Sequence, residues 1–344
     1  MPTVPTSPNP KRNLALGVLL GLIVGFGVAV LREVLDTKVR SEADVQKVTD
    51  ASVIARIGHD EDAPQHPLIV QSSPHSHRSE AFRRLRTNLQ FLDLDDRPKT
   101  IVVTSSLSGE SKTTTAINLA ITMADAGSRV ALVDADLRRP SIAEYMGLEG
   151  EVGLTTVLIG QADLQDAIQP WGNGSLHVLP SGQVPPNPSE LLGSRSMANL
   201  LEQLTSAYDI VLIDTPPLLP VTDAAILAKI TGGALVVAAA DNLHRQQLAD
   251  GLGALDDVGA RVLGVVLNRL AHKQTDAYSY YDYYTPASGT GAKSRRTRGG
   301  TSGPTQRRAS RTGTRRSSSR SDASEDMEID PQTVQVSSPR EDNS

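Results

Sequence analysis

Residues 103–114 read Val103-Thr-Ser-Ser-Leu-Ser-Gly-Glu-Ser-Lys112-Thr113-Thr114, a polar loop between an apolar stretch and a helix-forming one. A loop in this position commonly binds phosphate, because its backbone N–H groups and the start of the next helix face the ligand. Lys112 would then reach the β- and γ-phosphates of a nucleotide, and the Thr113 hydroxyl would ligate Mg²⁺. The alternative to a phosphate-binding loop is a Ser- and Gly-rich turn before a helix that binds no ligand. The candidate nucleotide-binding residues are Ser106, Leu107, Ser108, Gly109, Glu110, Ser111, Lys112, Thr113 and Thr114.

The match to a phosphate-binding loop departs from the usual pattern at two glycine positions, which here hold Ser106 and Ser111. A Cβ at position 111 is expected to crowd the phosphate or to resist the backbone angles that glycine adopts freely.

Two further strand ends carry carboxylates. Asp134 and Asp136 close an apolar run that starts at Ala131, and Asp214 closes the run 210–213. Carboxylates at strand ends can hold Mg²⁺ or accept a hydroxyl proton, and an aspartate after an apolar strand has the form of the one that supports Mg²⁺ in P-loop proteins. The three sites, in this order, predict a site for ATP and Mg²⁺.

Regular alternation of apolar strands with helices predicts an α/β fold with a doubly wound, mainly parallel sheet of the P-loop NTPase type. The aromatic content is only 3% against 39% hydrophobic residues, which suits a core of Val, Ile, Leu and Ala. The predicted strands are 101–104, 130–134, 177–179, 210–214, 234–239 and 262–267, and the predicted helices are 112–126, 188–206, 221–230 and 244–257.

An unbroken apolar run spans residues 14–31. As a helix it is roughly 27 Å long, close to the thickness of the hydrocarbon core of a bilayer. A signal peptide is the alternative, but Arg32-Glu33 follows the run where a cleavage site would need small residues. We therefore expect a single-pass anchor in the inner (plasma) membrane. The catalytic part is expected in the cytoplasm, where ATP is found.

The flanking segments differ in composition. Five of the seven tyrosines lie in 278–284, and 286–320 contains ten Lys or Arg and no acid before a short acidic end. The net charge of −5 argues against a nucleic-acid partner, and the absence of Cys excludes disulfides and thiolate chemistry.

The predicted domains are an N-terminal flank (1–13), a transmembrane helix (14–31), a juxtamembrane connector (32–74, with a short helix near 41–50 and a strand near 53–57), a P-loop domain (75–270), a tyrosine cluster (271–285) and a disordered tail (286–344).

Taken together, these motifs resemble the bacterial tyrosine kinases of capsule and exopolysaccharide synthesis. The resemblance covers roughly residues 5–284. The apolar helix looks like the last transmembrane helix of the family's chain-length regulator, whose preceding periplasmic domain is absent from this sequence. It is expected on a separate chain, unless the start is truncated. The motifs that carry the resemblance are the loop 104–114, Asp134-x-Asp136-x-Arg138, Asp214-Thr-Pro-Pro217, Pro185-Pro-Asn-Pro-Ser-Glu-Leu-Leu192 and the closing tyrosine cluster.

The resemblance implies a role for each candidate residue. Lys112 and the loop amides would bind the phosphates of ATP, and Mg²⁺ would be held by Thr113, Asp136 and Asp214. Asp134 would be the base for the incoming tyrosine hydroxyl, although the roles of Asp134 and Asp136 could be exchanged. The catalytic residues are then Lys112, Asp134 and Asp136, and the phosphoacceptors are Tyr278, Tyr280, Tyr281, Tyr283 and Tyr284.

The family also implies partners. Glu80, Arg83 and Arg86 match its Glu-x-x-Arg-x-x-Arg motif, which would join copies into a homo-oligomeric ring; the alternative is a solvated helix face with internal ion pairs. A chain-length-regulating membrane protein and a cognate tyrosine phosphatase are further expected partners.

Two other functions remain open on the sequence. One is a membrane-anchored ATPase switch without kinase activity, against which the tyrosine cluster argues. The other is a catalytically degenerate nucleotide-binding scaffold, which Ser106 and Ser111 keep open.

Overall fold

The computed structural model describes residues 10–63, 65–92, 99–240 and 242–271, with the backbone only at 33 and 34. The tyrosine cluster and the tail predicted to be disordered lie outside these residues.

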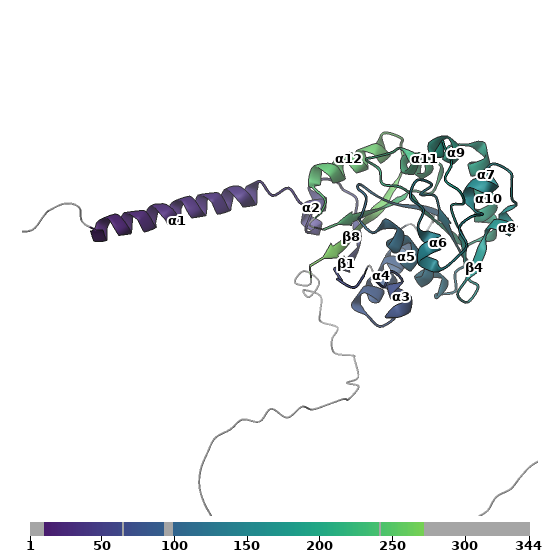
Figure 1. The fold of residues 1–344 in the computed structure, drawn as a ribbon, viewed down its shortest axis with the longest axis horizontal. Helices are drawn as coiled ribbons and strands as arrows, with labels where there is room; N and C mark the ends of the chain where they lie inside the picture. Colours follow the sequence, from purple (N-terminus) through teal and green to yellow (C-terminus); the bar gives the residue numbers. More distant parts are fainter. Residues whose placement is uncertain (1–9, 64, 93–98, 241, 272–344) are drawn as a thin grey trace, which may run out of the picture. The chain divides into compact units, whose positions relative to one another are not determined.

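One eight-stranded sheet organises the described chain, in the order β1-β8-β7-β2-β6-β3-β5-β4 (Figure 1). All neighbouring strands are parallel except β4, which runs antiparallel to β5 at the edge. The central strands are buried at almost every position, which explains their continuous Val, Ile, Leu and Ala runs. The strands are β1 (Val53–Gly58), β2 (Thr100–Ser105), β3 (Val130–Asp134), β4 (Gln169–Trp171), β5 (Leu176–Leu179), β6 (Ile210–Asp214), β7 (Ala234–Ala239) and β8 (Val262–Leu270).

Helices cover both faces of the sheet, and each face has its own apolar core. One core contains side chains of α3 to α6, and the other contains side chains of α2 and of α7 to α12. The expected doubly wound, mainly parallel α/β fold is confirmed. The helices are α1 (Pro10–Val34), α2 (Glu42–Gln46), α3 (Ile69–Ser72), α4 (His77–Phe91), α5 (Lys112–Ala124), α6 (Ile142–Met146), α7 (Leu154–Leu158), α8 (Leu164–Ala167), α9 (Pro188–Leu192), α10 (Arg195–Ala207), α11 (Asp223–Ile230) and α12 (Arg245–Asp256).

All six predicted strands of the sheet are present, but the single helix predicted over 188–206 is two helices. Gly193 ends α9, and the Ser194 side chain caps α10 by accepting a hydrogen bond from the Met197 N–H. A serine cap satisfies a backbone donor at a helix start, so the chain begins a new helix here.

The segment 32–74, expected as a connector, contributes α2, β1 and α3 to the fold. Val39 and Val45 are fully buried in one of the two cores, and β1 pairs in parallel with β8 as an edge strand of the sheet. The expected helix near 41–50 is the shorter α2, and the expected strand near 53–57 is β1.

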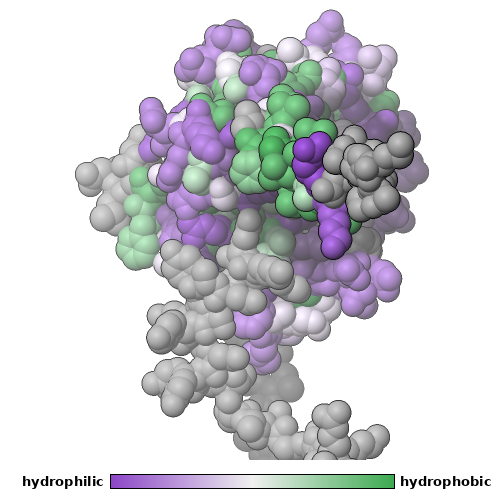
Figure 2. Space-filling view, turned by 90° about the vertical axis from the view of Figure 1, so that its left-hand side faces the viewer, coloured by the Kyte–Doolittle hydropathy of each residue, from purple (hydrophilic) through white to green (hydrophobic). Residues whose placement is uncertain are grey.

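Helix α1 is a candidate membrane-spanning helix. Residues 10–32 are long and apolar enough to cross a bilayer, and their hydropathy window is not buried by other residues. Exposed large apolar side chains of the described residues concentrate in α1, from Leu14 to Leu31. On the face shown in Figure 2, apolar side chains form a large green group in the centre and a smaller one at the left edge, and most of the remaining coloured surface is hydrophilic.

Candidate active site

The topology brings the three sequence motifs to one edge of the sheet. Strand β6 lies between β2 and β3, and Asp134 and Asp214 are register partners across β3 and β6. Because the three strands are parallel, the loops after their carboxyl ends lie side by side, which is where open α/β sheets bind ligands.

The loop after β2 leads directly into α5, which begins at Lys112. Gly109 and Ser111 both have positive φ angles, of 83° and 70°. The loop therefore turns sharply before the helix, and the free N–H groups at the start of the 13-residue α5 lie next to it. This is the geometry of a phosphate-binding loop.

The two serines that replace glycine are accommodated in different ways. Ser111 takes the left-handed conformation despite its Cβ, which costs on the order of 1 kcal/mol or more. Its Oγ accepts a hydrogen bond from the Arg269 guanidinium at 3.3 Å. Ser106 is fully buried, and α12 approaches it closely because Gly251 has no side chain; a Cβ there would lie 2.6 Å from the Ser106 Oγ.

Lys112 is the cation at the centre of the site. Its Nζ lies 2.8 Å from an oxygen of Asp136 and 3.8 Å from one of Asp214. The Thr113 hydroxyl donates to the same Asp214 oxygen at 2.7 Å. Burial alone would lower the pKa of Lys112, but the carboxylates of Asp214 and Asp136 raise it, so the ammonium stays charged.

Asp134 faces the loop that leads into α6. One of its oxygens accepts the backbone N–H of Asp136, and the other accepts those of Ser141 and Ile142. Burial, together with the nearby Asp214, raises the pKa of Asp134 to about 7. Asp136 is thus the carboxylate in direct contact with Lys112, and the assignment of Asp134 as the base stays a prediction.

The residues present fit a magnesium ion. Burial raises the pKa of Asp214 to about 6, and its Oδ1 is buried without a hydrogen-bond partner among the described residues. An unpaired buried carboxylate oxygen beside the Thr113 hydroxyl and Asp136 suits a hard cation. In the described part of the chain no cluster of three or more His, Cys, Asp or Glu is arranged to hold a metal. Mg²⁺ needs only one or two carboxylates when phosphate oxygens supply further ligands.

A cavity of about 760 Å³ lies over this site, which is large enough for a nucleotide. Its walls include Lys112, Thr113 and Asp136 from the motifs, Tyr145 from α6, and Arg269.

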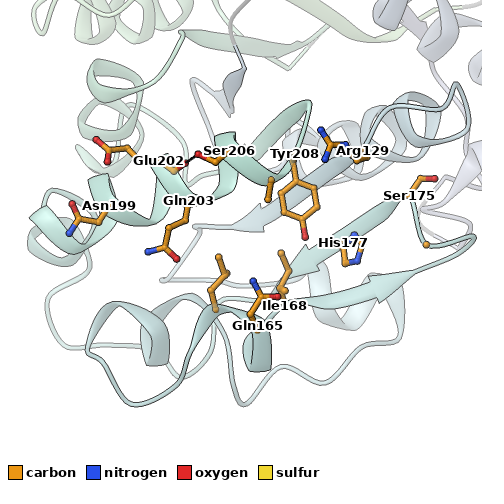
Figure 3. Close-up of a pocket in the computed structure, with 13 residues that line it drawn as sticks. Arg129, Gln165, Ile168, Ser175, His177, Asn199, Glu202, Gln203, Ser206 and Tyr208 are labelled. Atoms are coloured by element: carbon orange, nitrogen blue, oxygen red, sulfur yellow. Dashed lines mark hydrogen bonds between the residues drawn. The ribbon is translucent and has the colours of Figure 1, made fainter. Parts of the chain in front are cut away.

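A second cavity, of about 860 Å³, lies at the opposite edge, by the amino ends of β3, β5 and β6 (Figure 3). It is lined by α8 and α10, and the rings of His177 and Tyr208 lie 5.4 Å apart in it. None of the motif residues lines it, so the smaller cavity is the candidate active site.

The Glu80, Arg83 and Arg86 side chains on α4 make contacts within the chain. Arg83 pairs with Glu80 and donates to the carbonyl of Pro74, and Arg86 donates to the carbonyl of Thr122 on α5. Arg86 therefore ties α4 to α5, which the sequence did not indicate, and the role of the motif in a ring stays a prediction. The five predicted phosphoacceptor tyrosines lie outside the described residues.

Arg138 joins two motifs that are distant in the sequence. Its guanidinium donates to both oxygens of Asp223 and to the Ser189 hydroxyl, which itself donates to Asp223 at 2.6 Å. Asp223 is fully buried at the start of α11, and Ser189 belongs to the Pro- and Leu-rich motif in α9. The network fixes the loop after β3 to the helices beside the site.

Arg138→Met is expected to lower the free energy of unfolding by about 2 kcal/mol. Removing one partner of a buried pair costs about 3–5 kcal/mol, and the partial exposure of Arg138 reduces this value. Denaturant unfolding would measure the loss. Arg129→Met is the matched control, because its partner Asp209 is exposed and no measurable change is expected. Equal losses in the two variants would contradict the prediction.

Fold and site together define a nucleotide-binding protein of the P-loop class. Residues 98–243 match a family described as an AAA domain. The chain is 40% identical over 220 residues to the tyrosine-protein kinase YwqD of Bacillus subtilis, covering 64% of this chain and 92% of the relative. It is also 32% identical over 296 residues to the tyrosine-protein kinase Etk of Escherichia coli, covering 80% of this chain but only 41% of that one.

Solved structures similar to this chain include kinase domains of the same kind as these relatives. The kinase domain of the Escherichia coli tyrosine kinase ETK is 30% identical with a TM-score of 0.62, over 70% of this chain and 95% of the domain. The crystal structure of the chimerical protein CapA2B2 is 38% identical with a TM-score of 0.63, over 67% of this chain and all of the chimera. The chain belongs to the family of bacterial tyrosine-protein kinases.

Proposed function

We propose that this chain is an ATP-dependent tyrosine autokinase that phosphorylates Tyr278, Tyr280, Tyr281, Tyr283 and Tyr284. One observation carries the proposal: Lys112, Thr113, Asp136 and the unpaired oxygen of Asp214 meet at the start of α5. Tyrosine-protein kinases among the relatives support the choice of acceptor.

Each residue has a defined task in this mechanism. Bound Mg²⁺ would neutralise charge on the phosphates, as in phosphoryl transfer generally. Lys112 would exchange its contact with Asp136 for phosphate oxygens, and the loop N–H groups would orient the γ-phosphate. Thr113, Asp136 and the free oxygen of Asp214 would hold the metal.

The acceptor hydroxyl also needs a base. Asp134 would accept its proton, and a pKa of about 7 suits that task at neutral pH. Most of the rate enhancement would come from positioning and charge neutralisation.

The cellular role is part of the same proposal. By its family resemblance the kinase would regulate polymerisation and export of an exopolysaccharide or capsule. Helix α1 would anchor it in the inner membrane with the sheet domain in the cytoplasm. Glu80, Arg83 and Arg86 would contact a neighbouring copy in a ring, in which one subunit phosphorylates the tail of the next. A chain-length regulator and a phosphatase would be its partners.

Incubation of the full chain with Mg-ATP is expected to place phosphate on the 278–284 cluster, because that segment holds five of the seven tyrosines of the chain. Mass spectrometry of the tail peptides would locate the phosphate. A variant with all five tyrosines changed to Phe should lose the signal and retain ATP binding. ATP hydrolysis without phosphotyrosine would instead favour the ATPase switch, and phosphotyrosine only after Ser111→Gly would favour the degenerate scaffold.

A further inference from the structure

Glu110 is the one acidic residue of the phosphate loop, and its side chain is buried, with only 1% of the residue exposed. One carboxylate oxygen accepts the N–H of Leu107 within the loop at 2.7 Å. The other accepts the N–H of Ala239, the last residue of β7, at 3.0 Å. Its backbone carbonyl accepts from the Asn268 side chain on β8 at 3.5 Å. Glu110 thus ties the loop to two strands that carry none of the sequence motifs.

The next residue, Ser111, holds the conformation that glycine usually supplies. Among the described residues, only Ser111 and Arg269 have a positive φ without being glycine. Such a conformation persists only where its surroundings fix it. On the helix side, the Ser111 carbonyl accepts from the Thr115 N–H and from the Thr114 and Thr115 hydroxyls. On the loop side, the preceding residue, Glu110, is held in place by the two hydrogen bonds of its carboxylate.

We propose that Glu110 is a positioning residue of the phosphate loop. Its carboxylate fastens the loop to β7 and so keeps Ser111 in the left-handed conformation that aims the loop and the start of α5 at the phosphates. The inference rests on the proposed function, in which this loop binds ATP.

The geometry requires a carboxylate at this position. Two backbone donors use two different oxygens, and an amide of the same shape offers one acceptor oxygen and one NH₂ donor. In Glu110→Gln, the side-chain NH₂ group would therefore face the N–H of either Leu107 or Ala239, so two donors would meet. The side-chain volume would stay the same. A residue that merely filled space would tolerate this change.

A double-mutant cycle in the full chain tests the inference. The affinity for Mg-ATP would be measured for the wild type, Glu110→Gln, Ser111→Gly and the double variant. Glu110→Gln is expected to weaken binding about ten- to hundredfold, in line with one buried donor left unpaired. Ser111→Gly alone is expected to bind Mg-ATP at least as tightly as the wild type, because glycine adopts this left-handed conformation without strain. The double variant should recover most of the affinity that Glu110→Gln loses, because glycine adopts the required conformation without the hydrogen bonds of the Glu110 carboxylate.

Glu149→Gln is the matched control. Glu149 is exposed and does not line the cavity over the loop, so its substitution should leave the affinity unchanged. Hydrogen exchange of the folded variants adds a second readout. Glu110→Gln should speed exchange in the peptides 105–112 and 234–240, whereas faster exchange throughout the domain would overturn the inference.

The outcomes separate this inference from the proposed function. If the wild type binds Mg-ATP and Glu110→Gln binds equally well, only the inference fails. It fails in the same way if Ser111→Gly does not restore binding to Glu110→Gln. If the wild type itself does not bind Mg-ATP, the proposed function fails and the inference falls with it.

Discussion

Lys112→Met is expected to reduce tyrosine autophosphorylation by about two to three orders of magnitude, the usual loss for one charge-stabilising donor at a transition state. Lys112 contacts Asp136 and lies within 4 Å of Asp214, and it is the cation placed to meet the transferred phosphate. Its loss also removes the ammonium that pairs with the two buried carboxylates. ATP affinity is therefore expected to fall together with the rate. Quantitative phosphotyrosine mass spectrometry and an ATP-binding assay would measure both effects.

Lys99→Met is the control for this variant. Lys99 is exposed, and its Nζ lies 3.4 Å from the carbonyl of Thr205, away from the loop. Its removal should leave phosphorylation unchanged. Thermal unfolding of Lys112→Met would show that the variant is folded. Full phosphorylation of a folded Lys112→Met protein would refute the assignment of this lysine.

The stability of the nucleotide-free protein is expected to decrease as the pH rises from about 4 to about 7. The pKa of Asp134 is raised to about 7 and that of Asp214 to about 6, from 3.8. The folded protein therefore binds these protons more tightly than the unfolded chain. The stability that these two groups contribute is fully present below pH 3.8 and is lost as both ionise. One pKa unit corresponds to about 1.4 kcal/mol, so the decrease is on the order of a few kcal/mol. Denaturant unfolding at several pH values with a chelator would measure it.

Asp214→Asn should flatten this pH dependence. Glu110, whose pKa burial also raises, keeps part of the slope in the variant. The carboxyls whose pKa is lowered, such as Asp60 and Asp209, act only as the pH falls below their usual range, outside this window. Mg²⁺ at pH 7 should restore stability to the wild type but much less to Asp214→Asn, since binding to the folded state stabilises it. A wild-type stability that rises between pH 4 and 7 would contradict the prediction.

Much of the site could be predicted because its geometry follows from local pattern and parallel topology. Buried apolar runs that end in Asp134 and Asp214 mark strand ends, and parallel strands bring those ends to one edge. The phosphate loop could also be predicted, because the segment lies between a predicted strand and a predicted helix and contains Lys112 and Thr113. What the sequence left open there was whether Ser111 would adopt the glycine conformation, because that depends on contacts from other strands.

The contacts that were missed are those between residues distant in the sequence. No local pattern shows that Glu110 turns inward to meet Ala239, or that Arg138 joins Ser189 to Asp223. The three-residue β4 was also missed. It is short, and Pro170 lies within it, which is tolerated only because β4 is an edge strand.

The pairing of residues 37–39 with 243–245 limits how far the sheet domain can travel from a bilayer that holds α1. The Arg245 N–H donates to the carbonyl of Thr37, and the Val39 N–H donates to that of Leu243. Only two residues separate Thr37 from Val34, the last residue of α1, so this linker extends on the order of 10 Å. Anchored copies would therefore meet by lateral diffusion in a thin layer beside the lipid. The rate at which one copy modifies another would then follow the number of molecules per unit area of membrane rather than the concentration in the cytosol.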